Sequence, residues 1–208
     1  MSAGAGVHGD CEIQAKRAVQ QMMDTSDKPA LRAQMRALRK RLAEVELGAG
    51  PRAAAHAAAL PPGDLVAVYR AMGSELDPEP LALALAASGR RLCLPVVLER
   101  DAPMIFRAWS PGEPLEMDAV GCAAPLPLAE TIDPDLIIAP LLAFDHAGGR
   151  LGQGGGYYDR TFSARPHVTR VGLAYAGQQF VRLPIEAHDI RLHGVLTETG
   201  YRPFGISH

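Results

Sequence analysis

The sequence predicts an α/β fold, a single Rossmann-like domain in which helices flank a mainly parallel or mixed sheet. Short apolar segments typical of strands alternate along the chain with segments of helical periodicity, which favours this fold class. One segment, residues 135–144, is almost continuously apolar, as expected of a strand covered on both faces. With 208 residues, the chain is long enough to bury a substantial core. We therefore expect residues 27–208 to form this domain and residues 1–26 to be a partly mobile extension.

Composition and charge argue against several classes of protein. Hydrophobic residues make up 48% of the chain and charged residues 21%, which is the balance of a folded domain. A formal net charge of −2 argues against a globally basic nucleic-acid-binding protein. No apolar stretch is long enough to span a membrane, and the chain does not begin with a secretion-signal pattern. The cysteines (Cys11, Cys93 and Cys122) lack CxxC spacing, so we expect a reducing compartment and a cytoplasmic protein.

The first strong element is a helix that we expect to begin near Asp27. Ser26 and Asp27 can cap it, and Pro29 suits its first turn. Apolar residues then recur at alternating spacings of four and three, which predicts one buried stripe (Leu31, Met35, Leu38, Leu42 and Val45). We interpret the basic residues further along this helix as a solvated face (Arg36, Arg39, Lys40 and Arg41). A second, Ala-rich helix is expected over residues 51–59.

Strand and helix segments alternate from residue 64 onward. Short apolar segments predict six strands, over residues 64–70, 91–97, 104–109, 135–144, 168–176 and 194–199. Two helices are expected between them, over residues 77–88 and 156–164. The stretch 110–130 is rich in Pro and Gly, and we interpret it as irregular.

A glycine-rich loop directly follows the apolar segment 135–144. Residues 144–160 read FDHAGGRLGQGGGYYDR and lead into an expected helix. In a sheet of this kind ligands bind at the carboxyl ends of the strands, where this loop must lie. Glycines let backbone N–H groups approach a phosphate, and Arg150 adds a planar cation suited to phosphate oxygens. The loop matches neither the Walker pattern nor GxGxxG, which would need glycine at Tyr157.

This loop and its flanks resemble the 5-formyltetrahydrofolate cyclo-ligase family, also called 5,10-methenyltetrahydrofolate synthetases. The specific match is APLLAFDHAGGRLGQGGGYYD at residues 139–159, and the resemblance spans residues 28–198. Weaker matches in the family's order are KPALR at 28–32, YRAMGSELDP at 69–78 and LPIEAHDIRL with VLTE within 183–198. The resemblance implies cyclisation of 5-formyltetrahydrofolate to 5,10-methenyltetrahydrofolate. The implied reaction consumes ATP, requires Mg²⁺, passes through an imino-phosphate and releases ADP and phosphate.

The resemblance also implies roles for individual residues. Arg150 is the expected catalytic residue, because it would stabilise charge on the transferred phosphoryl group. ATP binding is implied for two residues of the first helix and for the loop (Lys28, Arg32, Arg150, Leu151, Gly152, Gln153, Gly154, Gly155, Gly156, Tyr157 and Tyr158). Folate binding is implied for an overlapping set (Arg32, Arg70, Glu75, Gln153, Gly154, Gly155, Gly156 and Tyr157). Two carboxylates are implied to hold Mg²⁺ (Asp159 and Asp189).

These residue types suit the implied chemistry. Two carboxylates together with phosphate oxygens and water suit a hard octahedral cation. A carboxylate at Glu75 can accept hydrogen bonds from two adjacent donors of a pterin. Because N10 of the folate itself attacks the activated carbon, the protein has to align groups and stabilise charge rather than supply a nucleophile. Arg150, as a residue at the tip of a loop, is expected to carry little core packing.

Three positions depart from the family pattern, and two other functions stay open. Gly155 stands where some relatives have Lys, His193 where an acid is frequent, and Ala124 where Glu is frequent. A sugar-phosphate isomerase-like enzyme on a similar fold would turn over without a nucleotide. A non-catalytic folate- or nucleotide-binding protein would bind 5-formyltetrahydrofolate without forming ADP. The sequence favours a monomer that acts on these small molecules, with no nucleic-acid or membrane partner.

Overall fold

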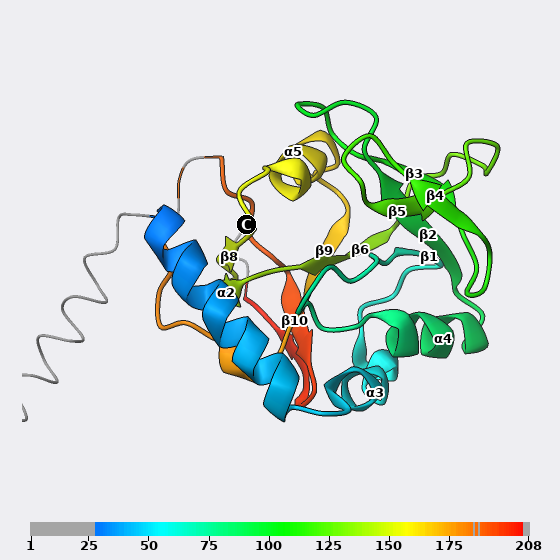
Figure 1. Cartoon of the computed structure of the whole chain (residues 1–208). Coiled ribbons are helices and arrows are strands. Elements are labelled where there is room, and N and C mark those ends of the chain that lie inside the picture. Colours follow the sequence, from blue (N-terminus) through cyan, green and yellow to red (C-terminus); the bar gives the residue numbers. More distant parts are fainter. Residues whose placement is uncertain (1–27, 185, 187, 206–208) are drawn as a thin grey trace, which may run out of the picture.

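The computed structural model describes residues 28–184, 186 and 188–205 (Figure 1). The extension expected over residues 1–26 lies outside the described residues. At the centre of the described part is a seven-stranded sheet with the order β11-β10-β9-β6-β1-β2-β3. Its inner strands pair in parallel, whereas β11 and β3 at the two edges pair antiparallel to their neighbours. The predicted α/β fold with a mainly parallel or mixed sheet is therefore confirmed.

The strands of this sheet match the expected segments except at one edge. They are β1 (Leu65–Ala67), β2 (Arg91–Val96), β3 (Ile105–Ala108), β6 (Leu136–Pro140), β9 (Thr169–Leu173), β10 (Gly194–Thr197) and β11 (Gly200–Pro203). The sequence analysis missed β11, which returns from β10 through a two-residue turn, Glu198 and Thr199, and begins at Gly200 (φ +137°). Its burial pattern is mostly intermediate, so it has no apolar run that would mark it as a strand.

Two small hairpins stand outside the main sheet, and both correct the sequence analysis. One pairs β4 (Leu115–Met117) with β5 (Ala123–Pro125), within the stretch 110–130 that we expected to be irregular. The other pairs β7 (Ala143–Phe144) with β8 (Arg150–Leu151). The expected strand 135–144 is therefore two strands, β6 and β7. The chain leaves the sheet after β6 while its side chains stay buried, so apolar periodicity does not reveal the bend.

Helices cover both faces of the sheet. They are α2 (Lys28–Val45), α3 (Ala49–Ala54), α4 (Glu79–Ala87) and α5 (Tyr157–Ala164), with single turns of 3₁₀ helix η1 (Ala57–Ala59) and η2 (Ala176–Gln178). The expected helix 51–59 is thus α3 followed by η1. Side chains alternate along the inner strands: Leu136 and Ile138 pack with α3 and α4, whereas Ile137 and Ala139 pack with Phe162 of α5. This alternation explains why the strand segments are apolar at every position.

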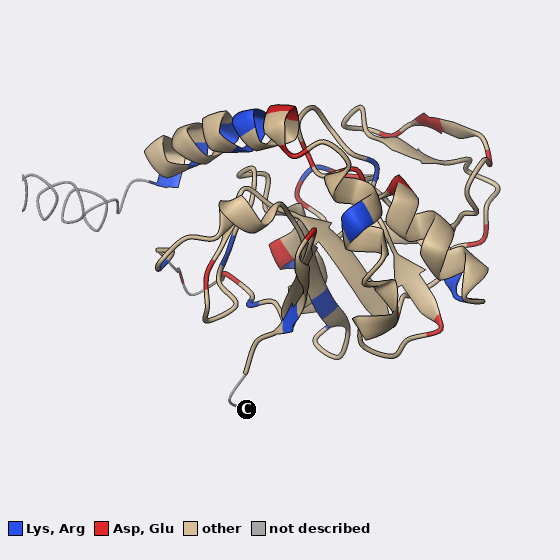
Figure 2. Ribbon diagram, turned by 90° about the horizontal axis from the view of Figure 1, so that it is seen from below, with Lys and Arg blue, Asp and Glu red and all other residues tan. Residues whose placement is uncertain are grey.

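Helix α2 lies beside the sheet and packs against the hairpin β7–β8 (Figure 2). Leu31 and Met35 are buried, as expected, but Val45 is 70% exposed and does not belong to the buried stripe. Arg39 is buried instead, with 5% of its surface exposed. No helix within the described ranges is long and apolar enough to cross a membrane.

Candidate active site

A cavity of about 650 Å³ opens at the carboxyl ends of β1, β2 and β6. Residues of α2, of the glycine-rich loop, of α5 and of the hairpin β4–β5 line it. Every residue predicted to be catalytic or to bind ATP, folate or metal lies in its wall, from Lys28 and Arg32 on α2 to Asp189 near the end of the chain. The structure therefore brings the predicted site residues together at one place, while their individual roles stay predictions.

Two arginines of α2 hold the glycine-rich loop by its carbonyl groups. Arg32 Nε donates to Gly152 O at 3.1 Å, and Arg36 donates to Gln153 Oε1 at 3.0 Å and to Gln153 O at 3.1 Å. Arg36 is exposed, as expected of a residue on a solvated face, but it also contacts the loop, which the sequence analysis did not predict. Gly154 favours glycine because its φ of +105° lies in the left-handed region, which residues with a Cβ rarely adopt.

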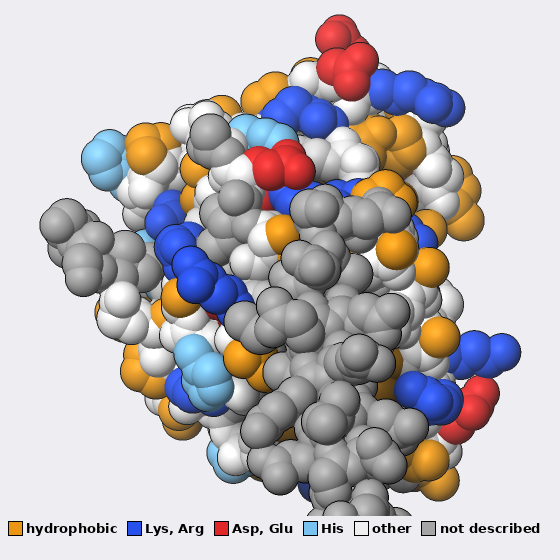
Figure 3. Space-filling model, turned by 90° about the vertical axis from the view of Figure 1, so that its left-hand side faces the viewer, with side chains coloured by type: hydrophobic (Ala, Val, Ile, Leu, Met, Phe, Trp, Pro, Cys, Tyr) orange, Lys and Arg blue, Asp and Glu red, His pale blue; other side chains and the backbone are white. Residues whose placement is uncertain are grey.

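Beyond these contacts, α2 has the solvated basic face that the sequence predicts. Lys40 and Arg41 are exposed. Figure 3 shows one side of the molecule, on which several Lys and Arg side chains reach the surface. The basic residues of α2 therefore divide into a group that contacts the cavity loop and a group that faces water.

Arg150 is a buried part of the cavity wall. Its side chain is 4% exposed, and its Nη2 donates to Asp159 Oδ2 at 2.8 Å, where the Asp159 side chain is 20% exposed. The guanidinium also lies over the Tyr158 and Phe162 rings, at 5.6 and 5.8 Å from their centroids. The expectation of an exposed loop tip with little packing was wrong. Within the described part of the chain, Nε of Arg150 is buried and has no hydrogen-bond partner.

A second cation–carboxylate pair joins the start of α2 to the segment before β10. Lys28 Nζ lies 2.7 Å from Asp189 Oδ2 and 3.2 Å from Glu186 Oε1. Burial acts to raise the pKa of Asp189, but hydrogen bonds from the Glu186 N–H and from Lys28 outweigh it and hold this pKa below its usual value. Asp189 is therefore a charged carboxylate at neutral pH.

Asp159 and Asp189 fit a magnesium site that is completed by a ligand. The two carboxylates lie in the same region, because Ile190, the residue directly after Asp189, has its N–H 3.5 Å from Asp159 Oδ1. Each carboxylate holds its cation through Oδ2, and each Oδ1, which lies near the Ile190 N–H in Asp159 and 3.8 Å from His188 Nε2 in Asp189, keeps a lone pair for a metal. No group of three His, Cys, Asp or Glu side chains among the described residues could hold a metal. Mg²⁺ commonly uses one or two carboxylates plus phosphate oxygens, so the residues fit Mg²⁺ bound together with a phosphate compound.

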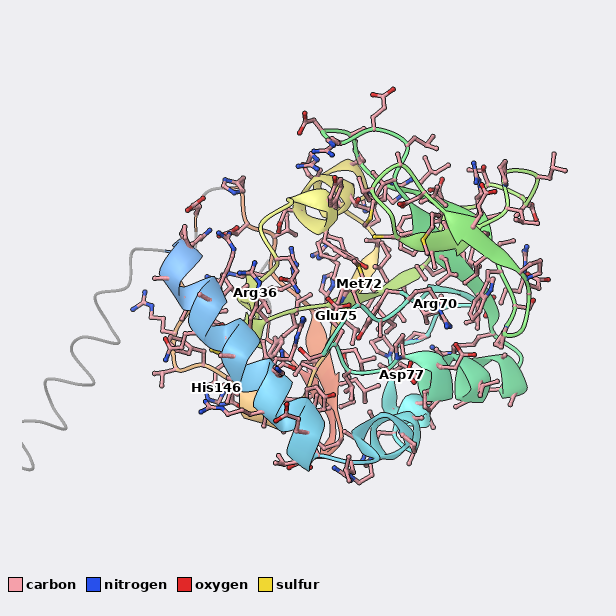
Figure 4. The ribbon with its side chains drawn as sticks, viewed as in Figure 1. Arg36, Arg70, Met72, Glu75, Asp77 and His146 are labelled. Carbon is pink, nitrogen blue, oxygen red and sulfur yellow. The ribbon has the colours of Figure 1, made fainter. Side chains whose placement is uncertain are left out.

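Glu75 lies at the other end of the cavity and is held by an arginine. Its side chain is 7% exposed, and Oε1 lies 3.3 Å from Arg39 Nη1, while Oε2 accepts the Met72 N–H at 3.0 Å. Figure 4 shows Met72 and Glu75 side by side, with Arg70 further toward α4. Arg70 pairs with Glu79 and lies 5.7 Å from the centroid of the Trp109 ring.

The sequence analysis placed Arg39 on a solvated face, and the structure corrects this. A signal was available, because Leu31, Met35 and Arg39 follow one another at intervals of four residues along α2. The first two are buried, and the third continues the same row toward Glu75.

The cavity also has an apolar half, none of whose lining residues was among the site residues predicted from the sequence. Its wall includes Tyr69, Val97, Met104 and the tip of the hairpin β4–β5, with Val120 and Cys122. Burial, and after it the Glu75 carboxylate, raise the pKa of Tyr69 and of Tyr158, so both hydroxyls stay protonated at neutral pH. The hairpin could not be found from the sequence, because its strands are short and lie in a Pro- and Gly-rich stretch.

Asp118 fixes the hairpin tip against the end of β2. Its carboxylate accepts hydrogen bonds from the N–H groups of Val97, Val120 and Cys122, at 2.8 to 3.0 Å. Cys122 Sγ also lies 3.6 Å from Met72 Sδ. The apolar half therefore has a defined wall, which suits a flat, largely apolar ligand.

The chain is similar to known proteins in sequence and in fold. Residues 24–198 match the sequence profile of the 5-formyltetrahydrofolate cyclo-ligase family. The 5-formyltetrahydrofolate cyclo-ligase of Escherichia coli K12 is 38% identical over 142 residues, which are 64% of this chain and 76% of that protein. The 5,10-methenyltetrahydrofolate synthetase of Aquifex aeolicus has a TM-score of 0.68 at 29% identity, over 87% of this chain and 94% of its own. The synthetase of Mycoplasma pneumoniae, at 22% identity, supports the fold with a TM-score of 0.65, over 83% of this chain and 99% of its own.

Proposed function

The chain belongs to the 5-formyltetrahydrofolate cyclo-ligase family of enzymes, and on this premise we propose that it converts 5-formyltetrahydrofolate to 5,10-methenyltetrahydrofolate with ATP and Mg²⁺. One observation carries the proposal. A single cavity joins a glycine-rich loop with buried cations to an apolar half that ends at the Glu75 carboxylate. Such a cavity can hold a nucleotide phosphate beside a flat heterocycle, which a ligase of this type must do.

The proposed reaction has two steps. The formyl oxygen on N5 attacks the γ-phosphorus of ATP, so that an O–P bond forms and the bond to the departing ADP breaks. N10 then attacks the formyl carbon of this imino-phosphate, the C–O bond breaks, and phosphate leaves with the former formyl oxygen. N10 loses its proton, and the five-membered ring of the methenyl product is closed. Both nucleophiles come from the substrate, so the protein contributes alignment and stabilisation of charge.

The two cation–carboxylate pairs support the assignment of the phosphate half. Lys28 pairs with Asp189, and Arg150 pairs with Asp159. We propose that both cations turn to phosphate oxygens when Mg-ATP binds, while the two carboxylates face the metal. Mg²⁺, when bound there, neutralises phosphate charge. This exchange keeps the local charge balanced, because the cations pair with phosphate instead of carboxylates and the carboxylates pair with Mg²⁺ instead of the cations.

Arg150 is the group we propose to act on the transferred phosphoryl. Its guanidinium presents several N–H groups in a fixed plane, which suits phosphate oxygens. Its Nε is buried and has no hydrogen-bond partner among the described residues, so the proposed turn of the side chain toward a phosphate oxygen would give this N–H an acceptor. Arg32 is proposed to serve the same half of the cavity, next to the glycine-rich loop.

We further propose a cytoplasmic monomer that acts on these two small molecules. Cys93 and Cys122, the cysteines within the described residues, are unpaired thiols, which supports a reducing compartment. Nucleic-acid and membrane partners are not part of the proposal.

The test is an absorbance assay for the methenyl product, with and without Mg-ATP. The proposal predicts product only when 5-formyltetrahydrofolate, ATP and Mg²⁺ are all present, with one ADP formed per product. Turnover of a sugar phosphate without nucleotide would instead support an isomerase. Tight binding of 5-formyltetrahydrofolate with neither ADP nor product would support a non-catalytic binding protein.

A further inference from the structure

Arg39 is buried below the folate half of the cavity, and the mechanism above gives it no task. It is 5% exposed and is not part of the cavity wall. Its Nη1 lies 3.3 Å from Glu75 Oε1 and donates to Leu141 O at 3.4 Å, while its Nε donates to Ser74 Oγ at 3.2 Å. One side chain of α2 thus links the turn that carries Glu75 to the chain just after β6.

Glu75 depends on this arginine for its charge balance. The Glu75 side chain is 7% exposed, so water solvates it poorly. Arg39 is the basic side chain within ion-pair distance of Glu75 in the part of the chain that the structure describes. A carboxylate withdrawn from water is costly unless it is paired, so without Arg39 the charged form of Glu75 would lose its main support.

The two contacts of Glu75 leave room for a ligand. Arg39 uses one acceptor position on Oε1, and the Met72 N–H uses one on Oε2. Each carboxylate oxygen has two lone pairs, so one acceptor position remains on each oxygen. The geometry suits a ligand edge with two adjacent N–H donors, and it exists only while the carboxylate is held in this orientation.

We propose that Arg39 is a positioning residue, which pairs with Glu75 and holds it oriented for the folate without touching the folate itself. This inference rests on the proposed function of the cavity. It differs from the roles of Arg32 and Arg36, which lie on the same helix but contact the glycine-rich loop. Loss of Arg39 therefore affects folate binding and leaves the ATP half unchanged.

The test compares the dissociation constant for 5-formyltetrahydrofolate, measured by calorimetry without ATP, with the KM for ATP. Arg39→Met is expected to weaken folate binding at least about tenfold, the scale of one hydrogen bond to a charged group. The KM for ATP should change by less than about twofold from the wild-type value, which is well below the expected effect on folate binding. Arg39→Lys keeps a cation near Glu75 and should recover part of the folate affinity. Lys40→Met, at an exposed position on the same helix, is the matched control and should change neither constant.

The double variant Arg39→Met/Glu75→Gln separates positioning from a general structural effect. If Arg39 acts through Glu75, the double variant binds folate as weakly as Glu75→Gln alone and no more weakly. The double variant also removes both buried charges, so it serves as the folded variant if Arg39→Met alone does not fold.

Three results would overturn the inference. They are wild-type folate affinity in Arg39→Met, an equal loss of ATP and folate binding, or a double variant that binds folate more weakly than Glu75→Gln. These results leave the proposed function intact as long as the wild-type chain forms the methenyl product. A wild-type chain that forms no product would instead contradict the proposed function itself.

Discussion

The buried pair of Arg150 and Asp159 allows stability and catalysis to be separated. Arg150→Met removes the cation but keeps an unbranched side chain against the Tyr158 and Phe162 rings. Breaking a buried ion pair by removing one partner costs about 3–5 kcal/mol. We take about 3 kcal/mol, the low end, because water still reaches part of Asp159. For a chain of this size that loss lowers the Tm by about 6–12 °C.

Turnover of Arg150→Met should fall by about 10²- to 10³-fold, the usual effect of losing one preorganised electrostatic donor. The double variant Arg150→Met/Asp159→Asn leaves no unpaired charge, so its Tm should return to within a few degrees of the wild-type value. Its turnover should stay low, because the phosphate and metal contacts are both missing. Thermal unfolding without ligand and the methenyl absorbance assay at saturating ATP measure the two effects. A double variant that regains turnover together with stability would show that the pair is purely structural.

Three further predictions concern the two halves of the cavity and the metal. Glu75→Gln should raise the KM for folate and leave ATP binding unchanged, because the amide presents a donor where a carboxylate accepts. Calorimetry that finds weaker ATP binding and unchanged folate binding would contradict the placement of Glu75 in the folate half. Asp159→Asn should lose activity and regain part of it at high Mg²⁺. Gly154→Val should not recover, because the φ of +105° at this position strains a β-branched residue. If turnover depends on Mg²⁺ concentration in the same way in both variants, Asp159 does not bind the metal. The lowered pKa of Asp189 means that its pair with Lys28 stabilises the fold above the unfolded pKa of about 3.9 and is lost as pH falls through the lower folded value. In Lys28→Met, the free energy of unfolding measured with urea should therefore fall less steeply with acidification below about pH 4 than in the wild type, and an unchanged slope would refute the pair's contribution.

The sequence predicted the parts of the candidate site whose residues lie close together along the chain. The glycines from 152 to 156 and the acid at Asp159 are close in the chain, and the rule that ligands bind at the carboxyl ends of parallel strands places them correctly. The same rule brings Glu75, which follows β1, to the same edge of the sheet. The sheet class and this edge could therefore be predicted without the structure.

The parts that the sequence missed depend on contacts between distant segments. Arg39 looks like one of several basic residues on α2, and only Glu75, 36 positions away along the chain, explains its burial. The hairpin β4–β5 consists of two three-residue strands, which are too short to show a period. The pairing of Arg150 with Asp159 also changed our expectation, because an arginine in a glycine-rich loop gives no local sign that it is buried.

Transfer of an oxygen isotope tests the central claim most directly, because it follows the atom that ATP is proposed to activate. 5-Formyltetrahydrofolate labelled with heavy oxygen in the formyl group is converted by the enzyme with Mg-ATP in ordinary water, and the released phosphate is analysed by mass spectrometry. Because the C–O bond of the imino-phosphate breaks, we predict one labelled oxygen in each phosphate formed. Unlabelled substrate in heavy-oxygen water serves as the control and should give unlabelled phosphate. Phosphate without the label from labelled substrate, or phosphate labelled by the solvent, would contradict the account.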